Sequence, residues 1–213
     1  MDGARPVDHG SDDVHDLRSG GGGFEMRLTV LREAGYEEAL LGMALSYAPP
    51  GVEMTEWWSL ERIEKARKRA YLLAHKGGGH NKFLESMQVW MHINATRGWW
   101  SQMDTYRAGV TKQSASTMHT LMKYPPQREH FHPDTPSACL EAFQSVWETP
   151  GVSIDRVKAA LPEGYLQDRL VCTNYKALQN MVAQRAAHRL GEWAEFCEQL
   201  RRQLQYPEYV FHE

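Results

Sequence analysis

One arginine near the end of the chain lies where an arginine is costly. Apolar residues recur at spacings of three and four over 174–204, which predicts a long amphipathic helix. Arg185 follows Leu178 by seven residues and Met181 by four, so it falls on the apolar face of that helix. A guanidinium stays charged and must meet an anion or several acceptors there. Two interpretations remain open: a functional site that supplies those acceptors, or an internal salt bridge, for instance with Glu85.

A second cluster of charge is basic. Residues 59–76 carry six Lys and Arg side chains against Glu61 and Glu64 in a helical pattern. The pattern favours a solvated face with intrahelical ion pairs, and the alternative is a positive rim for an anionic ligand. Three glycines, 77–79, end this helix and place His80 at the start of a short helix that runs through Glu85.

Metal and disulfide chemistry are not favoured. The three cysteines, Cys139, Cys172 and Cys197, are odd in number and scattered, without a CxxC pair. This usage suits reduced thiols in the cytoplasm. His130 and His132 lie beside prolines without a nearby carboxylate pair, which indicates a surface loop more than a metal site. We therefore predict no bound metal.

The charge balance limits the classes of partner. The chain of 213 residues has 24 Lys and Arg against 27 Asp and Glu, a net charge of −3. Residues 1–23 hold five acidic and two basic side chains and end in four glycines, which predicts a flexible tail. The remaining chain is neutral, and this argues against a general nucleic-acid binder. No run approaches 18 apolar residues and no signal peptide is recognisable, so we expect a soluble protein with no membrane partner.

Several elements must position these side chains. Alternating apolar residues predict strands, and periods of three and four or flanking prolines predict helices. The predicted strands are 24–31 and 87–95, and the further predicted helices are 36–47 and 136–147.

His80, Glu85, Arg97, Gln102 and Arg107 occur in this order over residues 80–107. This order resembles the flavin-dependent (ThyX-type) thymidylate synthases. That family has a His, a Glu five residues later, a strand, then Arg, Gln and the signature RHRxxSxNExSxRY. His80, Glu85, Arg97, Gln102 and Arg107 fit this order without gaps, and Gln102 falls 17 residues after Glu85 as the family's Gln does.

A second block carries the resemblance further along the chain. Ala160-Leu-Pro162, Asn174-Tyr-Lys-Ala-Leu-Gln-Asn180 and Arg185 are similar to the family's Arg-x-x-Leu-Pro, Asn-x-Arg-x-Leu-x-Asn and downstream Arg. The two blocks are independently spaced. The resemblance therefore covers most of residues 24–204.

The resemblance implies an α/β (α+β) fold over residues 24–213, a ThyX-like central sheet with flanking helices and a long C-terminal helix. It also implies a homotetramer whose sites are shared between subunits. The implied reaction methylates dUMP to dTMP: methylenetetrahydrofolate supplies the carbon, NADPH reduces FAD, and the flavin delivers hydride. No cysteine nucleophile takes part in that route.

Roles follow residue by residue from the resemblance. Arg185 would polarise the pyrimidine ring and orient it toward the flavin, which is electrostatic catalysis. Gln102 would contact the nucleotide, as would Ser114 and Lys158. The residues that would line the flavin site are His80, Glu85, Arg107, Asn174, Lys176 and Asn180, although Glu85 has the alternative role of holding an arginine in place.

The chain departs from the family pattern in the signature. Arg-His-Arg is replaced by Thr105-Tyr106-Arg107, and Ser114 reaches a signature serine position only with a one-residue slip. Lys158 and Lys176 stand where the family has arginines, and lysine offers a point charge without the bidentate fork. Each lost charged hydrogen bond costs about 1.5–3 kcal/mol.

These departures leave three functional hypotheses. The first is thymidylate synthesis, favoured because Arg185, Gln102, His80 and Asn180 are retained. The second is another C5 modification of a pyrimidine nucleotide, such as hydroxymethylation. The third is an inactive relic that binds nucleotides or other proteins. Trp99 and Trp100 are interpreted as core or subunit packing more than as stacking partners for a flavin or base.

Overall fold

A four-stranded antiparallel sheet forms the centre of the part of the chain that the structure describes, which is residues 26–212 of a computed structural model. The predicted tail, residues 1–23, lies outside the described residues, as does the start of the first predicted strand. The strand order is β1-β2-β4-β3, so the sequence neighbours β3 and β4 lie at one side. The strands are β1 (Arg27–Ala34), β2 (Gln88–Thr96), β3 (Thr111–Ser114) and β4 (Leu166–Asn174).

The alternation of buried and exposed side chains predicted for the central strand β2 is confirmed. Val89, Met91 and Ile93 are buried on one face of the sheet, whereas Trp90 and His92 point to the other face and remain partly or largely exposed. β2 pairs with β1 on one side and with β4 on the other, in both cases antiparallel.

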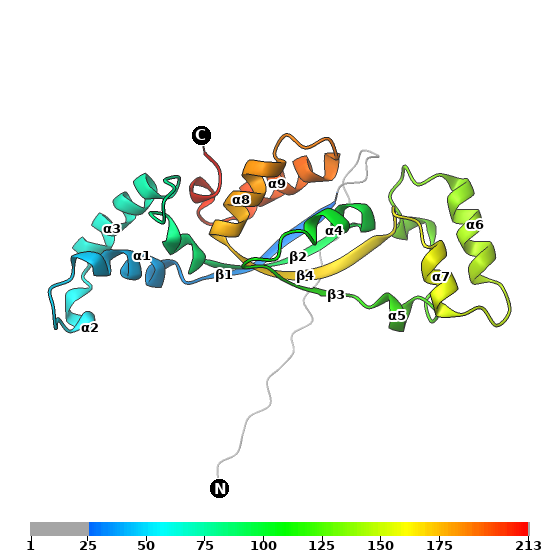
Figure 1. Ribbon diagram of the computed structural model, residues 1–213, viewed down its shortest axis with the longest axis horizontal. Coiled ribbons are helices and arrows are strands. Elements are labelled where there is room, and N and C mark those ends of the chain that lie inside the picture. Colours follow the sequence, from blue (N-terminus) through cyan, green and yellow to red (C-terminus); the bar gives the residue numbers. More distant parts are fainter. Residues whose placement is uncertain (1–25, 213) are drawn as a thin grey trace, which may run out of the picture.

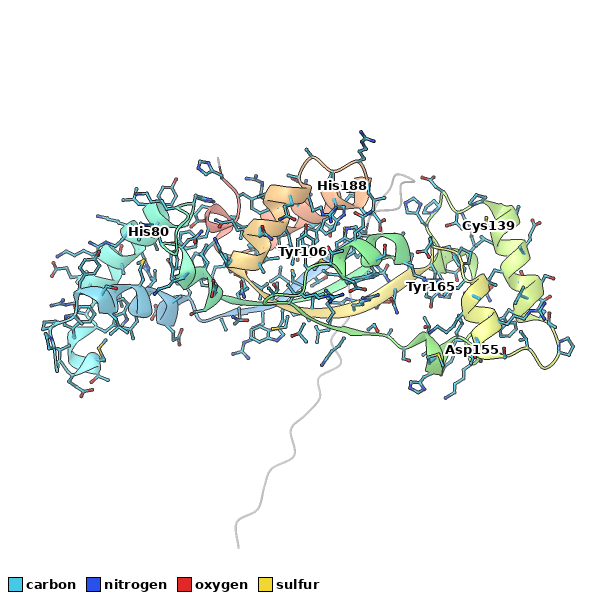
Figure 2. The ribbon with its side chains drawn as sticks, viewed as in Figure 1. His80, Tyr106, Cys139, Asp155, Tyr165 and His188 are labelled. Carbon is cyan, nitrogen blue, oxygen red and sulfur yellow. The ribbon has the colours of Figure 1, made fainter. Side chains whose placement is uncertain are left out.

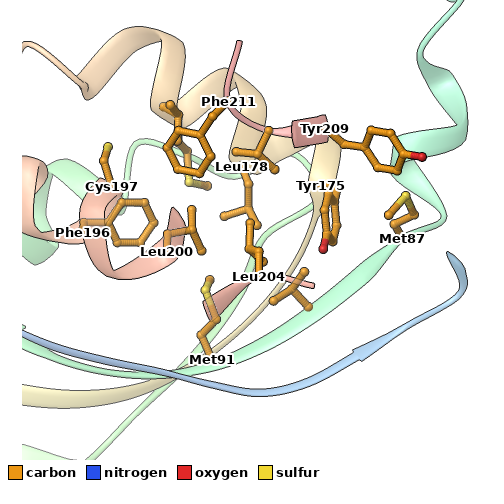
Figure 3. Close-up of a cluster of buried hydrophobic side chains, with 14 of the residues drawn as sticks. Met87, Met91, Tyr175, Leu178, Phe196, Cys197, Leu200, Leu204, Tyr209 and Phe211 are labelled. Atoms are coloured by element: carbon orange, nitrogen blue, oxygen red, sulfur yellow. The ribbon is translucent and has the colours of Figure 1, made fainter. Parts of the chain in front are cut away.

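Three helices cover the apolar face of the sheet (Figure 1). They are α4 (Arg97–Met103), α8 (Tyr175–Arg185) and α9 (Gly191–Gln203). Figure 3 shows the core between them, where Leu178 and Leu200 meet Met91 of β2. Trp99 and Trp100 are fully buried in this core, so the interpretation as packing residues is confirmed.

Helices extend the molecule beyond both ends of the sheet (Figure 1). One end holds α1 (Tyr36–Ala44), α2 (Met54–Trp57) and α3 (Leu60–Leu73), with 3₁₀ turns at Leu45–Tyr47 and Lys82–Glu85. The other end holds α5 (Thr117–Thr120), α6 (Ser137–Trp147) and α7 (Ile154–Ala160), with a 3₁₀ turn at Arg128–His130; another lies near the C-terminus at Pro207–Tyr209. A separate small core of Leu121, Phe131, Phe143, Val157 and Leu161 supports α6 and α7.

The helices predicted at 36–47, 59–76 and 136–147 are confirmed within a few residues. In α3, Lys65 and Arg67 form the expected intrahelical pairs with Glu61 and Glu64. These pairs are exposed, so they add little to the free energy of unfolding.

The predicted single helix over 174–204 is wrong. The chain forms α8 and α9 with a break at residues 186–190. Nδ1 of His188 accepts a hydrogen bond from the Leu190 backbone N–H at 3.1 Å, and Leu190 takes an extended conformation as the N-cap of α9. Apolar spacing alone does not detect the break, because both halves present apolar residues to the same core.

Candidate functional site

Arg185 is the last residue of α8, and the helix is fixed at its start and along its buried face. Asn174 caps the helix, because its Oδ1 accepts a hydrogen bond from the Ala177 backbone N–H at 2.9 Å. Leu178 and Met181 are fully buried. The next turn therefore brings Arg185 to the rim of the core, where it is half-buried.

The Arg185 guanidinium is held by neutral groups. Its Nε donates to the Tyr106 hydroxyl at 2.9 Å, and Nη1 donates to Oε1 of Gln102 at 3.3 Å. Its Cζ lies 5.0 Å from the centroid of the Trp193 ring and 5.6 Å from that of the Tyr106 ring. Aromatic faces attract a guanidinium without cancelling its charge.

Gln102 is oriented by the buried indole of Trp193. Trp193 Nε1 donates to Oε1 of Gln102 at 2.9 Å, so this oxygen accepts from both Trp193 and Arg185. Because the oxygen is occupied on the protein side, the amide nitrogen of Gln102 is the group left to act as a donor. The sequence-predicted pair Gln102 and Arg185 is thus brought together by α4, α8 and α9.

The hydrogen bonds continue from Tyr106 along α8. The Tyr106 hydroxyl donates to Oε1 of Gln184 at 3.0 Å, and Nε2 of Gln184 donates to Oδ1 of Asn180 at 3.0 Å. We call the six residues that these contacts connect the arginine network: Gln102, Tyr106, Asn180, Gln184, Arg185 and Trp193.

The arginine network has a positive charge without an internal counter-ion. Within residues 26–212, no carboxylate oxygen lies within 4.0 Å of Arg185, so the salt bridge considered with Glu85 is absent. Asp104, which follows α4, already accepts from Arg169 at 2.9 and 3.0 Å and lies 3.5 Å from Lys112 Nζ. The region can therefore attract an electron-rich or anionic ligand.

His80 and Glu85 line a separate cavity of about 480 Å³ between α1, α3 and the turn that precedes β2. Its wall also contains Arg69 and Lys82, and Arg69 stacks over the Tyr47 ring at 4.0 Å. Arg69 belongs to the basic helix and, among the described residues, is the one basic side chain that this helix contributes to the wall. The donors and the aromatic ring suit a ligand with phosphates and a planar ring system.

Two residues assigned to the flavin by resemblance are already engaged inside the chain. Besides capping α8, Asn174 packs against Gly109, where a Cβ would lie 2.6 Å from its Nδ2. Lys176 Nζ donates to Oε1 of Gln179 at 3.4 Å. Gln179 in turn donates to the backbone oxygens of Ala74 and Tyr209, which ties α8 to the C-terminal segment.

The remaining predicted residues come from segments of the chain other than α8. Arg107 is exposed after α4, and Ser114 ends β3 opposite Arg169 of β4. Lys158 is in α7. Figure 2 shows Asp155 of that helix near one end of the molecule, His80 near the other and Tyr106 between them. One chain therefore does not gather all the predicted residues at one place.

No group of three or more His, Cys, Asp or Glu within the described residues is arranged to hold a metal ion. Burial raises the pKa of the Cys197 thiol to about 11, against a smaller opposite effect of Arg201. This thiol stays protonated at neutral pH and is a poor nucleophile. None of the helices in residues 26–212 is long and apolar enough to cross a membrane.

Sequence reasoning missed three members of the arginine network. The motif comparison registers Tyr106 only as a departure from the family's histidine, and Trp193 is one of the apolar residues at spacings of three and four over 174–204. Gln184 follows Asn180 by four residues, and this helical spacing could have identified it.

Comparison with solved structures identifies the fold. The flavin-dependent thymidylate synthase ThyX from Helicobacter pylori, complexed with FAD and dUMP, matches with a TM-score of 0.71 at 16% identity, over 87% of this chain and 97% of that chain. A second structure of Helicobacter pylori ThyX with FAD and dUMP matches with a TM-score of 0.69 at 17% identity, over 88% of this chain and 97% of the other. No family model matches the sequence, and neither does any curated protein. The chain has the ThyX fold: a central sheet with flanking helices.

Proposed function

We propose that the protein binds the pyrimidine nucleotide dUMP at Arg185 and Gln102 and methylates it to dTMP. The observation that carries this proposal is the Arg185 guanidinium, which is half-buried, fixed by neutral acceptors and free of any carboxylate within the described chain. The fold adds support, since both Helicobacter pylori neighbours were crystallised with FAD and dUMP.

The chemistry assigned to Arg185 is electrostatic. Reduction at the uracil ring places negative charge on a ring carbonyl, and a fixed cation beside that oxygen stabilises the charge as it develops. The two neutral acceptors leave the guanidinium its full charge. A carboxylate in place of either would cancel much of it.

We propose that the amide N–H donors of Gln102 determine which pyrimidine ring binds. Its oxygen is used by Trp193 and Arg185, so the amide N–H groups face a ligand that presents acceptors. A uracil carbonyl is such an acceptor. The amino group of a cytosine at the corresponding position would meet a second donor and be disfavoured.

The cavity at His80 is proposed to bind part of FAD. Arg69, Lys82 and His80 can hold its phosphates, and Tyr47 offers a ring for stacking. Bound FAD, reduced by NADPH, would supply hydride, and methylenetetrahydrofolate would supply the carbon.

The cysteines need no role, in keeping with the raised pKa of Cys197. Three free thiols also suit the cytoplasm as the proposed compartment.

A homotetramer with shared sites accounts for the separated residues. Helix α7, which carries Lys158, and His80 lie near opposite ends of one chain, so Lys158 and His80 serve one site only if different subunits supply them. On the sheet face away from α8 and α9, Leu170 remains 36% exposed, and the β1 bulge residue Leu31 is 55% exposed. Contact between subunits would bury such side chains.

A nucleotide-binding protein without turnover is the second candidate. The observation that favours it is the internal use of Asn174 and Lys176, both assigned to the flavin by resemblance. Hydroxymethylation instead of methylation would leave the same binding geometry, but water instead of hydride would be added to the transferred carbon, so the reaction would consume no NADPH.

Ligand binding followed by product analysis separates these candidates. FAD and dUMP should each raise the melting temperature of the purified protein, since a ligand at 100 times its Kd adds about 2.7 kcal/mol. Tritium release from C5-labelled dUMP with methylenetetrahydrofolate and NADPH, with mass analysis of the product, distinguishes methylation, hydroxymethylation and inactivity. A colourless protein that neither ligand stabilises would contradict the enzyme proposal.

A further inference from the structure

The Tyr106 hydroxyl occupies the middle of the arginine network and makes two hydrogen bonds with opposite roles. It accepts from Arg185 Nε at 2.9 Å and donates to Oε1 of Gln184 at 3.0 Å. Gln184 is itself held by Asn180 on the preceding turn of α8. The hydroxyl is therefore fixed in direction, and its lone pairs face Arg185.

This contact leaves one edge of the guanidinium for a ligand. An arginine has five N–H donors, and within the described residues Arg185 uses Nε for Tyr106 and one Nη1 hydrogen for Gln102. Three N–H groups on Nη1 and Nη2 make no hydrogen bond to the described chain. They share one planar unit, so fixing Nε also fixes their direction.

A tyrosine achieves this without neutralising the cation. A phenol hydroxyl is a neutral hydrogen-bond acceptor, whereas the carboxylate of an aspartate or glutamate in the same place would form an ion pair with Arg185. The Tyr106 ring also meets the buried Trp193 ring at 6.1 Å, with an interplanar angle of 69°. Contacts with the core and with α8 therefore both hold the hydroxyl in place.

We propose that Tyr106 is the positioning residue of the site: its hydroxyl orients Arg185 so that the free guanidinium edge meets the acceptor oxygens of a pyrimidine nucleotide. The choice of nucleotide rests on the proposed function. The substitution of the family's histidine by Tyr106 is then an adaptation that keeps Arg185 in place.

The first test examines the contact itself and needs no ligand. Tyr106→Phe keeps the ring but removes the hydroxyl, and Tyr124→Phe, at a loop tyrosine that is 71% exposed, is the matched control. The Arg185 Nε–H signal in NMR is identified by its absence in Arg185→Lys. Hydrogen exchange of this signal should be faster in Tyr106→Phe and unchanged in Tyr124→Phe. An unchanged exchange rate in Tyr106→Phe would overturn the proposal.

The second test asks whether Tyr106 acts through Arg185. Ordering a free arginine side chain on binding costs a factor of roughly two to ten in affinity, so Tyr106→Phe should raise the Kd for dUMP by about that factor. In an Arg185→Lys background, Tyr106→Phe should change the Kd less than about twofold, because lysine has no Nε–H for the hydroxyl to hold. Equal weakening in both backgrounds would show a general structural role and overturn the proposal.

The two tests also separate this inference from the proposed function. If the wild-type protein binds no dUMP, the proposed function fails, and the exchange of the Arg185 Nε–H alone decides whether Tyr106 positions the guanidinium.

Discussion

The Glu192 carboxylate accepts two hydrogen bonds from Thr96: from its backbone N–H at 3.0 Å and from its hydroxyl at 2.7 Å. Glu192 is only 6% exposed, at the start of α9, and Thr96 is the last residue of β2 and the N-cap of α4. The pair therefore joins three elements at one point. It fixes where α9 begins and so places the neighbouring Trp193, whose indole holds Gln102.

Removing this carboxylate should destabilise the fold and loosen the site. Glu192→Ala leaves a buried backbone N–H and a hydroxyl of Thr96 without an acceptor, which costs about 1–3 kcal/mol. We expect a lower urea midpoint. Glu198→Ala is the matched control on the same helix, because Glu198 pairs only with the exposed Arg202 in the described structure. Equal midpoints for the two variants would refute the role of Glu192.

Gln102 should respond differently to two substitutions of similar size. Gln102→Glu places a carboxylate beside Arg185, so the variant should fold and keep a melting temperature close to that of the wild type while losing dUMP binding. Gln102→Leu removes the acceptor of the buried Trp193 N–H and should lower stability by about 1–3 kcal/mol. Thermal melts and dUMP titrations of both variants check this. Retained dUMP affinity in Gln102→Glu would argue against an uncancelled Arg185 charge at the site.

Arg185 itself should matter for turnover more than for folding. Removing a preorganised charge-stabilising group costs about 10²–10³ in kcat. We expect Arg185→Ala to lose tritium release by at least that factor, with a small change in melting temperature. Arg189→Ala, at an exposed arginine four residues further along the chain, is the control and should keep activity. Unchanged turnover in Arg185→Ala would contradict the catalytic role assigned to Arg185.

The sequence predicts those parts of the fold in which local pattern and burial agree. The alternation along Val89, Met91 and Ile93 predicts β2, and the spacing from Leu178 and Met181 places Arg185 beside the core. Both follow from periodicity, which depends only on near neighbours in the chain.

The remaining features depend on contacts between distant residues. The packing of the start of α9 depends on Glu192 meeting Thr96, 96 positions earlier, and no local signal encodes that partner. Likewise Tyr106 reaches Arg185 across 79 positions. A comparison of motifs records Tyr106 as a missing histidine, because it registers residue type without the hydrogen bond that the new residue makes.

Three buried side chains should make the free energy of unfolding depend on pH in the alkaline range. Burial raises the pKa of Cys197 to about 11, and burial also raises the pKa values of Tyr175 and Tyr209 well above the usual range for tyrosine. A second cause for Tyr175 is its hydrogen bond to Glu33, and for Tyr209 its hydrogen bond with Tyr36.

The sign of the effect follows from proton binding. Because the folded state holds these protons more tightly than the unfolded state, their contribution to stability is complete below the unfolded pKa values and is lost as pH rises through the folded ones. The urea midpoint should start to fall near pH 9, the ordinary pKa of the cysteine thiol, and fall further above pH 10, that of tyrosine. Tyr175→Phe should flatten the fall, and Tyr124→Phe should not. Identical slopes in the two variants would contradict this assignment.

If the sites are shared between subunits, mixing two inactive variants should restore activity. If Lys158 of one subunit serves the same site as Arg185 of a different subunit, Lys158→Ala and Arg185→Ala homo-oligomers should each lose activity. Unfolding and refolding a mixture of the two should form hetero-oligomers in which some sites receive both wild-type residues. Tritium release should then exceed the sum of the separate variants.

Light scattering should show the same assembly size before and after mixing. The control mixes Arg185→Ala with Gln102→Glu. These two side chains belong to the same chain, where Nη1 of Arg185 lies 3.3 Å from Oε1 of Gln102. Every site in a hetero-oligomer of these two variants therefore has either the altered Arg185 or the altered Gln102. This mixture should stay inactive. Recovery in the Lys158 mixture alone places Lys158 and Arg185 on different subunits of one site, whereas no recovery in either mixture would contradict sharing between subunits.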